Sequence, residues 1–406
     1  MSKIVVFSVT DFRCEIYEKY SIMKMLRNSE KLKKKREKNL KKSLGIYIHI
    51  PFCVRKCKYC DFLSGPAGKD TQKQYVEKLL EEIEQNRELL AERMTETIFF
   101  GGGTPSAIDA EDIAHILEKL KSYGNLSENA EISIEANPGT VTEEKLMIWK
   151  QAGINRISFG LQSADNEELK TLGRIHTWEE FVENYHLARK CGFHNINVDL
   201  MSALPGQTVD TWRNTMERVT ELNPEHISAY SLIIEEGTPF YEAYAKHPEL
   251  LPTEEEERTI YYETKSFLAA KGYERYEISN YAKPGYACRH NLSYWERVDY
   301  LGLGLGAASL LGNVRKSNQI EIKEYLQGNF EGEKEVLSET NAMEEYFFLG
   351  LRKMEGVDWT KYEESYAQII EKLVNKGLLE KDGDYVKLTE LGIDVSNQVL
   401  AEFLVE

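Results

Sequence analysis

Short runs rich in β-branched and aromatic residues recur along the chain, and a helical pattern follows each of them. The six runs are GIYIHI (45–50), ETIFFG (96–101), EISIEA (131–136), RISFGL (156–161), INVDLM (196–201) and HISAYSL (226–232). Residues 74–94 and 111–124 are two of the amphipathic stretches between them. Alternating strand and helix signals are typical of βαβ units and predict a parallel sheet. Six units favour an α/β fold with a partial (β/α)6 TIM-like barrel, and a doubly wound open sheet is the alternative.

Polar residues gather where these runs end. The sequence GGGTPS follows the second run, Glu135 ends the third, Gln162 follows the fourth, and Asp199 lies near the end of the fifth. In parallel α/β folds, ligands bind at the carboxyl ends of the strands. A carboxylate such as Asp199 inside an apolar strand is costly unless it is paired or bound to something. Each residue alone also fits a role in capping a loop, but together with a cysteine-containing loop after the first run they predict one ligand-binding mouth.

The pattern changes after about residue 240, and four regions are expected. Residues 45–280 form the core barrel, and residues 281–337 form a connecting segment that is rich in glycine and aromatic residues. Residues 338–406 are mainly helical, with a predicted hairpin turn at Asp382-Gly383 that indicates a winged-helix-like domain. Residues 24–42 contain ten Lys or Arg and only two Glu. We expect 1–44 to be a basic, poorly ordered extension, because charge runs are usually solvated; an arm touching anionic lipid or nucleic acid is the alternative.

Composition narrows the class of protein. The 406 residues carry a formal net charge of −16, which argues against a general nucleic-acid binder. No run of 18 apolar residues and no charged-then-apolar leader is present, so we expect neither a transmembrane helix nor export, and at most transient membrane contact. Six cysteines are too few for a disulfide scaffold and indicate a reducing, cytoplasmic compartment.

Three cysteines are clustered in the stretch YIHIPFCVRKCKYCDF, with the spacing C-x3-C-x2-C for Cys53, Cys57 and Cys60. A structural zinc site usually has four protein ligands, and no further Cys or His lies near enough in sequence to supply the fourth. Thiolates also hold iron–sulfur clusters. Three thiolates on a [4Fe-4S] cluster leave one iron open to a small molecule with adjacent amino and carboxylate groups, such as S-adenosylmethionine. The pattern therefore favours an iron–sulfur cluster over zinc.

The cysteine spacing after a first barrel strand resembles the radical S-adenosylmethionine superfamily. The stretches YIHIPFC, GGGTPS, IEANPGT, RISFGLQS, GRIHT and NVDLMSALPGQT are similar to the oxygen-independent coproporphyrinogen III oxidase family over roughly residues 45–400. The resemblance implies that Tyr47 lies beside the sulfonium and that Tyr59 packs on the adenine. It also implies that the amino acid end of S-adenosylmethionine is bound at Gly102, Gly103 and Thr104, and that the cofactor pocket is completed by Glu135, Gln162, Arg174 and Asp199.

Two positions depart from the oxidase pattern. The oxidases carry a further cysteine two residues after the third, where this chain has Phe62. Phe62 and the stretch HNLSYW (290–295) both resemble a haem chaperone branch of the same family. That branch implies binding of haem and its transfer to an acceptor protein, such as a respiratory haem protein, with an electron donor as a further partner.

The resemblance makes His290 a candidate axial ligand of haem iron, since neutral imidazole binds haem iron well. Cys288 and His176 are other candidates, and the alternative for His290 is that it only stabilises a loop. Three functions therefore remain open: a haem chaperone without decarboxylase activity, an oxidative decarboxylase that forms protoporphyrinogen IX, and a different radical enzyme. Phe62 and HNLSYW favour the first.

Overall fold

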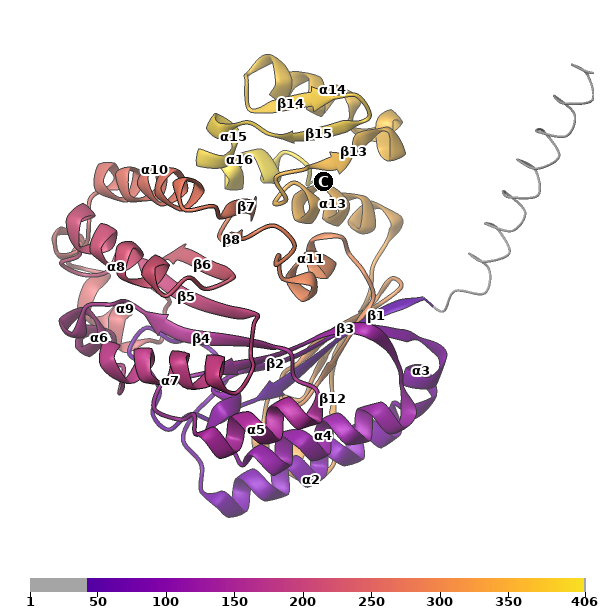
Figure 1. The fold of residues 1–406 in the computed structure, drawn as a ribbon. Coiled ribbons are helices and arrows are strands. Elements are labelled where there is room, and N and C mark those ends of the chain that lie inside the picture. Colours follow the sequence, from indigo (N-terminus) through magenta and orange to yellow (C-terminus); the bar gives the residue numbers. More distant parts are fainter. Residues whose placement is uncertain (1–41, 405–406) are drawn as a thin grey trace, which may run out of the picture. The chain divides into compact units, whose positions relative to one another are not determined.

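Six parallel strands form the centre of the fold in the computed structural model, which describes residues 42–404. These strands are β1 (Ser43–Ile50), β2 (Met94–Gly102), β3 (Asn125–Ala136), β4 (Arg156–Gln162), β5 (Ile196–Ser202) and β6 (His226–Ser231). Each pairs in parallel with the next strand in chain order (Figure 1). A doubly wound sheet would reverse its strand order at a switch point, and this sheet does not. The predicted α/β fold with a parallel sheet of sequential order is confirmed.

Helices connect the six strands and cover the outer side of the sheet (Figure 1). They are α2 (Lys69–Gln85), α3 (Arg87–Glu92), α4 (Ala110–Tyr123), α5 (Glu143–Ala152), α6 (Asn166–Leu172), α7 (Trp178–Lys190) and α8 (Val209–Glu221). In α4 the buried residues Ile113, Ile116, Leu117 and Leu120 recur at the spacing of one helix face. The stretch predicted as one helix over 74–94 instead forms α2 and α3, separated at Asn86. The apolar runs of β1 to β6 are buried because helices cover one face of the sheet and the other face points into the barrel interior.

The sheet continues beyond the barrel strands on both sides. The elements on the β6 side are α9 (Pro239–Tyr244), α10 (Glu254–Ala270), β7 (Glu274–Glu277) and β8 (Asn280–Ala282). The elements on the β1 side are α11 (Arg289–Trp295), β9 (Tyr300–Leu303), β10 (Ala308–Leu311), β11 (Val314–Asn318), α12 (Ile322–Leu326) and β12 (Glu331–Val336). Residues 281–337 are thus more than the connecting segment that the sequence predicts. Their strand β9 pairs with β1 in parallel, and this joins the segment to the main sheet. The outermost strand β12 exposes all six of its residues, with the sequence EGEKEV.

The C-terminal region has a core of its own. Its elements are α13 (Glu339–Gly350), β13 (Val357–Asp358), α14 (Glu363–Asn375), β14 (Leu379–Asp382), β15 (Tyr385–Leu388), α15 (Glu390–Asp394) and α16 (Ser396–Ala401). Phe347 stacks on Phe403 with the ring centroids 4.8 Å apart, and both side chains are fully buried. The predicted hairpin is present, because β14 and β15 are antiparallel and Gly383 at the turn has φ of +59°. The predicted basic extension over 1–44 lies almost entirely outside the described residues, and its last two residues begin β1.

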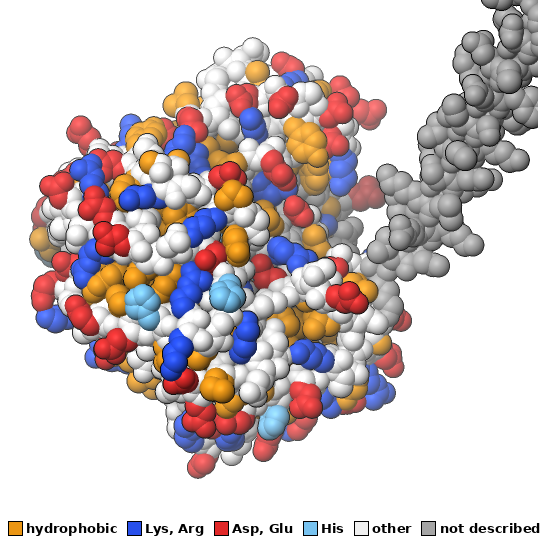
Figure 2. Space-filling view, viewed as in Figure 1, with side chains coloured by type: hydrophobic (Ala, Val, Ile, Leu, Met, Phe, Trp, Pro, Cys, Tyr) orange, Lys and Arg blue, Asp and Glu red, His pale blue; other side chains and the backbone are white. Residues whose placement is uncertain are grey.

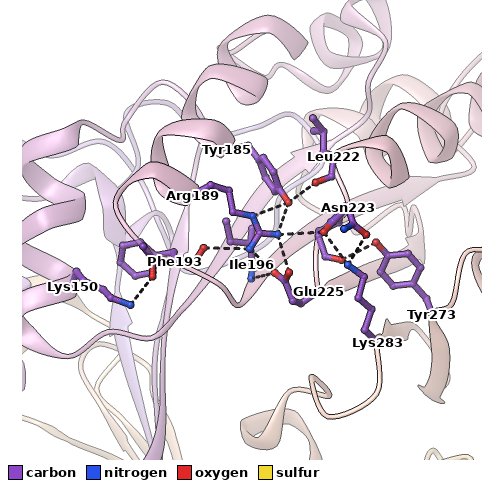
Figure 3. Close-up of polar contacts among 12 residues, drawn as sticks. Lys150, Tyr185, Arg189, Phe193, Ile196, Leu222, Asn223, Glu225, Tyr273 and Lys283 are labelled. Atoms are coloured by element: carbon purple, nitrogen blue, oxygen red, sulfur yellow. Dashed lines mark hydrogen bonds and ion pairs between the residues drawn. The ribbon is translucent and has the colours of Figure 1, made fainter.

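A polar cluster fastens α7 to the amino ends of β5 and β6 (Figure 3). The Arg189 guanidinium forms an ion pair with Glu225 at 2.8 Å and donates to the Tyr185 hydroxyl at 2.6 Å. Glu225 also accepts a hydrogen bond from the backbone N–H of Ile196 at 3.1 Å. A planar guanidinium–carboxylate pair fixes the relative position of the two elements that it joins. The amino end of the barrel is therefore held rigidly, opposite the carboxyl ends of the strands.

Acidic and basic side chains are intermixed on the face shown in Figure 2, without a continuous area of one sign. Within residues 42–404, none of the helices combines the length and the apolar character that crossing a membrane requires.

Candidate functional site

The cysteine loop lies between β1 and α2 at the carboxyl ends of the barrel strands. Cys53, Cys57 and Cys60 line a cavity of about 370 Å³ there. Two backbone hydrogen bonds fasten the loop to neighbouring segments: the Cys53 N–H donates to the Gly65 carbonyl at 3.0 Å, and the Lys58 N–H donates to the Leu172 carbonyl at 3.0 Å. The loop is therefore positioned by the barrel before any ligand binds.

The His49 ring connects β1 to the end of the cysteine loop. Its Nε2 lies 2.9 Å from the Leu63 carbonyl and its Nδ1 lies 3.1 Å from the Tyr47 hydroxyl. With the proton on Nε2, the ring donates to Leu63 and accepts from Tyr47. His49 thus fixes both the loop and the Tyr47 side chain.

The glycines at the end of β2 allow the backbone to approach the cysteine loop closely. Gly102 has φ of +113°, and a Cβ added there would lie 2.6 Å from the His49 ring. A Cβ at Gly103 would lie 3.0 Å from the Cys53 sulfur. Only glycine combines this backbone conformation with this approach. The end of β2 can therefore lie against His49 and Cys53 only because both positions lack a side chain.

A chain of hydrogen bonds connects Thr104, Asn137 and Arg174 along one wall of the cavity. The Asn137 amide donates to Thr104 Oγ1 at 2.8 Å, and Arg174 Nη2 donates to Asn137 Oδ1 at 2.6 Å. At its two ends, Thr104 Oγ1 lies 3.5 Å from the Cys53 sulfur and Arg174 Nη1 lies 3.5 Å from the Cys57 sulfur. Arg174 is half-buried, and its Nε is buried without a partner within the described part of the chain. Unused donors beside thiols suit an anionic sulfur-bound group and a carboxylate.

Two carboxylates form the floor of the cavity. Glu135 accepts a hydrogen bond from the Gly102 N–H at 3.2 Å, while Asp199 accepts from Ser158 at 3.0 Å and from Asn197 at 2.7 Å. Burial, and after it the neighbouring Asp199, raise the pKa of Glu135 to about 8. Burial also raises the pKa of Asp199, against the effect of its hydrogen bonds. Burial disfavours the charged form of both acids, and a bound cation would favour it. The pair of acids therefore suits a cationic ligand.

Aromatic and amide groups complete the opposite wall. Gln162 has φ of +75°, and its side-chain oxygen accepts a hydrogen bond from the Tyr230 hydroxyl at 3.5 Å. The Tyr59 ring packs against Phe240 with the centroids 6.3 Å apart, and burial raises the pKa of Tyr59. Tyr59 thus presents a neutral aromatic face at the cavity, which suits a purine ring.

The structure brings all but two of the predicted site residues around this one cavity. Its lining contains Cys53, Cys57, Tyr59, Cys60, Gly102, Gly103, Thr104, Glu135, Gln162, Arg174 and Asp199. Asn137 and Tyr230 also line it, and neither is among the residues predicted from the sequence. Both lie in stretches recognised as strand ends, so their position after β3 and near the end of β6 was the available signal. Tyr47 lies beneath the floor, where its pKa is raised by burial and by Glu135.

His290 lies away from the cavity, and its surroundings do not suit a haem ligand. Its side chain is 1% exposed and stacks on Phe99 with the centroids 5.2 Å apart. Nδ1 lies 2.8 Å from Thr97 Oγ1 and Nε2 lies 3.2 Å from the Tyr294 hydroxyl. Burial lowers the pKa of His290 to about 3. Both ring nitrogens are in hydrogen bonds, so neither is free for iron, and the residue instead joins α11 to β2.

The two alternative haem ligands are also buried. Cys288 is fully buried with its sulfur 3.5 Å from Glu131 Oε1, and burial raises its pKa to about 12. Complete burial and the contact with Glu131 leave the Cys288 sulfur inaccessible to a haem iron. His176 is 4% exposed and its Nε2 lies 3.2 Å from the Leu161 carbonyl, beside the cavity rather than in it.

The residues present fit a thiolate-held cluster with an amino acid ligand. The donor set is three thiols, and beside it lie a glycine-lined space, a guanidinium with a buried, free N–H and two carboxylates. Among residues 42–404, no three His, Cys, Asp or Glu side chains lie close enough together to hold a single metal ion. This arrangement does not suit zinc, whose ligands converge on one atom, whereas each thiolate of a cluster binds a different iron.

Comparison with known proteins agrees with this chemistry. Residues 47–219 match the Radical SAM superfamily and residues 337–395 match the HemN C-terminal domain. Heme chaperone HemW of Lactococcus lactis is 35% identical over 378 residues, which cover 90% of this chain and 99% of that protein. Heme chaperone HemW of Escherichia coli is 36% identical over 376 residues, covering 89% and 98%.

A solved structure shares the fold over nearly the same length. Coproporphyrinogen III oxidase (HemN) of Escherichia coli, described as a radical SAM enzyme, matches with a TM-score of 0.79 and 25% identity, covering 90% of this chain and 91% of that one. The identity to the HemW proteins is higher over a similar share of the chain. The predicted relationship is confirmed: the chain belongs to the radical SAM superfamily and, within it, to the HemW family.

Proposed function

We propose that this protein is a haem chaperone, which binds haem and passes it to an acceptor protein in the cytoplasm. The observation that carries the proposal is the identity of 35–36% to heme chaperones HemW over almost their whole length. The fold alone does not separate a chaperone from an oxidase, since HemN has a similar fold. Phe62, which stands where oxidases carry a further cysteine, supports the same choice.

The cavity is the proposed site of the [4Fe-4S] cluster and S-adenosylmethionine. Cys53, Cys57 and Cys60 would hold three irons, and the fourth iron would be open to the amino acid end of S-adenosylmethionine. When bound, the two groups supply one-electron cleavage of a carbon–sulfur bond. Arg174 places positive charge 3.5 Å from the Cys57 sulfur, which stabilises the thiolate.

The carboxylates and the glycines have separate proposed roles in the same site. Glu135 and Asp199 attract the positive charges of the ligand, and Glu135, whose pKa is about 8, loses its proton as the ligand binds. Gly102 and Gly103 leave the space in which its amino and carboxylate groups reach the cluster. Tyr59 provides an apolar face for the adenine and excludes water from that side.

We place haem over the mouth of the cavity rather than at His290. Two large apolar side chains at the mouth are exposed to solvent, Phe62 at 59% and Ile233 at 69%. An exposed apolar pair at the rim of a polar cavity indicates a ligand surface, and a flat macrocycle would cover both side chains. The acceptor would then approach the same face.

One anaerobic experiment tests the proposal. The reconstituted protein is titrated with haem and followed by absorbance, and the same sample is then incubated with coproporphyrinogen III, S-adenosylmethionine and a reductant. We expect stoichiometric haem binding and no protoporphyrinogen IX, with HemN as the positive control for turnover. Repeated turnover to protoporphyrinogen IX would show an oxidase. A Phe62→Ala variant should weaken haem binding about tenfold, while Val336→Ala, which alters an exposed apolar residue far along the sheet on β12, should not.

A further inference from the structure

The cysteine loop carries three basic side chains. Arg55, Lys56 and Lys58 are exposed. Arg55 donates to the Gly173 carbonyl at 2.7 Å and Lys56 donates to the Phe62 carbonyl at 2.8 Å. None of the three takes part in an ion pair within residues 42–404, although many other Lys and Arg side chains there do. Uncompensated positive charge therefore lies directly over the thiols of a chain whose net charge is −16.

A small hollow beside Cys57 adds apolar surface to this charge. Val54 and Ile175 both line it, and they are 59% and 47% exposed. None of the residues that line the hollow is acidic. The Lys58 side chain lies against the same edge, since a Cβ at Gly173 would be 3.0 Å from its Cγ. We call Val54, Arg55, Lys58 and Ile175 the loop patch.

Lys56 is left out of the loop patch because its surroundings differ. It lines another hollow together with Asp61 and Glu236, and Cys57 and Cys60 line that hollow as well. The lining of that hollow therefore contains two acidic side chains, although neither forms an ion pair with Lys56. The positive charge of the loop is therefore directed toward the side of Val54 and Ile175.

The loop patch has the character of a transient electron-transfer interface. Such interfaces are small, and complementary charge mainly raises the rate of encounter. A molecule of net charge −16 repels an acidic partner overall, and a local positive surface would weaken this repulsion and orient the partner. The Cys57 thiol lies at the hollow, and an electron entering there would have a short path to a cluster that Cys57 holds.

We propose that the loop patch is the docking site of a small, acidic, one-electron carrier protein, and this proposal rests on the proposed cluster at Cys53, Cys57 and Cys60. In the step itself, the carrier loses one electron and the cluster gains it, changing from the 2+ to the 1+ state. No bond is made or broken, and no proton has to move.

Charge reversal at the loop patch tests the proposal. The probe is an acidic flavodoxin, and its binding to the full chain is followed by flavin fluorescence at low and high salt. We expect Arg55→Glu with Lys58→Glu to weaken binding at least tenfold at low salt and to flatten the salt dependence. The matched control is Lys323→Glu with Lys334→Glu, which changes the net charge equally at exposed positions of α12 and β12. The conservative pair Arg55→Lys with Lys58→Arg should keep the binding.

A second measurement separates docking from damage to the cluster. Reduction of the cluster is followed anaerobically by loss of its visible absorbance, with either reduced flavodoxin or a photoreduced deazaflavin as the electron source. The charge-reversed variant should be reduced at least tenfold more slowly by flavodoxin, while the deazaflavin, which needs no docking surface, reduces it at the ordinary rate.

Three outcomes would overturn the proposal. The first is an equal loss of flavodoxin binding in the charge-reversed variant and the control, and the second is unchanged flavodoxin binding in both. The third is a defect only in haem transfer, which would make the loop patch the site of the haem acceptor. Flavodoxin binding does not depend on haem. A negative result here therefore leaves the haem titration to decide the proposed function.

Discussion

The two ends of the barrel contain similar residue types and use them differently. At the carboxyl end, Glu135 accepts a single backbone hydrogen bond and Arg174 keeps a buried N–H without a partner in the described chain. Toward the amino end, Glu131 accepts hydrogen bonds from the backbone N–H groups of Arg289 and His290, at 3.1 Å each. Both ring nitrogens of His290 are engaged as well. Cysteine, histidine and acid side chains therefore mark a ligand site only where their bonding capacity is left unused beside a cavity.

The strongest test of this comparison exchanges one cysteine at each end. Cys57→Ser should reduce the iron bound after anaerobic reconstitution from about four atoms per chain to less than one, since a cluster of this kind needs its thiolates. Cys288→Ser should keep the full iron content, because that thiol is buried near Glu131 and its pKa is raised to about 12. Iron and sulfide analysis gives both values, and full iron in the Cys57 variant would refute the assignment of the cluster.

The next test asks whether His290 has a structural role or binds haem. His290→Ala removes two side-chain hydrogen bonds and leaves a cavity, so the free energy of unfolding should fall by about 2–4 kcal/mol. His115→Ala, at an exposed position of α4, should change it by less than about 0.5 kcal/mol. Urea unfolding followed by circular dichroism measures both. Haem binding should remain stoichiometric in the His290 variant, and its loss without a change in stability would restore the ligand interpretation.

The smallest effect concerns the charge of Glu135 in the ligand-free protein. Because the folded chain keeps this proton up to a pKa of about 8 while the unfolded chain releases it near 4.5, stability falls as the pH rises between these values. From pH 6 to pH 7 the wild type should therefore lose about 1.4 kcal/mol relative to Glu135→Gln. Urea unfolding of both proteins at the two pH values measures this loss. A constant difference would mean that Glu135 is already ionised.

The sequence predicts the barrel well because its strands are long and strongly apolar. The fourth run was expected over 156–161, and β4 spans Arg156–Gln162. By contrast, β9 and β10 have four residues each and lie among glycines. Neither their length nor an alternation of apolar and polar residues therefore marks them as strands. The place of β9 in the main sheet depends on its pairing with β1, some 250 residues earlier in the chain, and β10 joins the sheet only through β9 and β11. No local pattern reports such pairing.

The same distinction applies to the site. The predicted residues at the strand ends gather at one cavity because parallel strands end on the same side, so topology alone brings Glu135 and Asp199 together. The environment of His290 could not be predicted, since Thr97, its Nδ1 partner, is 193 residues away in sequence. Asn137 was overlooked because its role depends on the positions of Thr104 and Arg174, which come from two other connections.

The charged outer strand β12 has a consequence for the behaviour of the protein at high concentration. The outer edge of such a strand offers free N–H and C=O groups to any other chain. A long sheet that ends in an apolar edge strand is therefore prone to aggregation. Here a second copy that added to the edge would bring the acidic side chains of Glu331, Glu333 and Glu335 close to its own. Repulsion of like charges thus opposes the addition of a further strand at this edge of the sheet, and we expect the folded chain to resist aggregation through it.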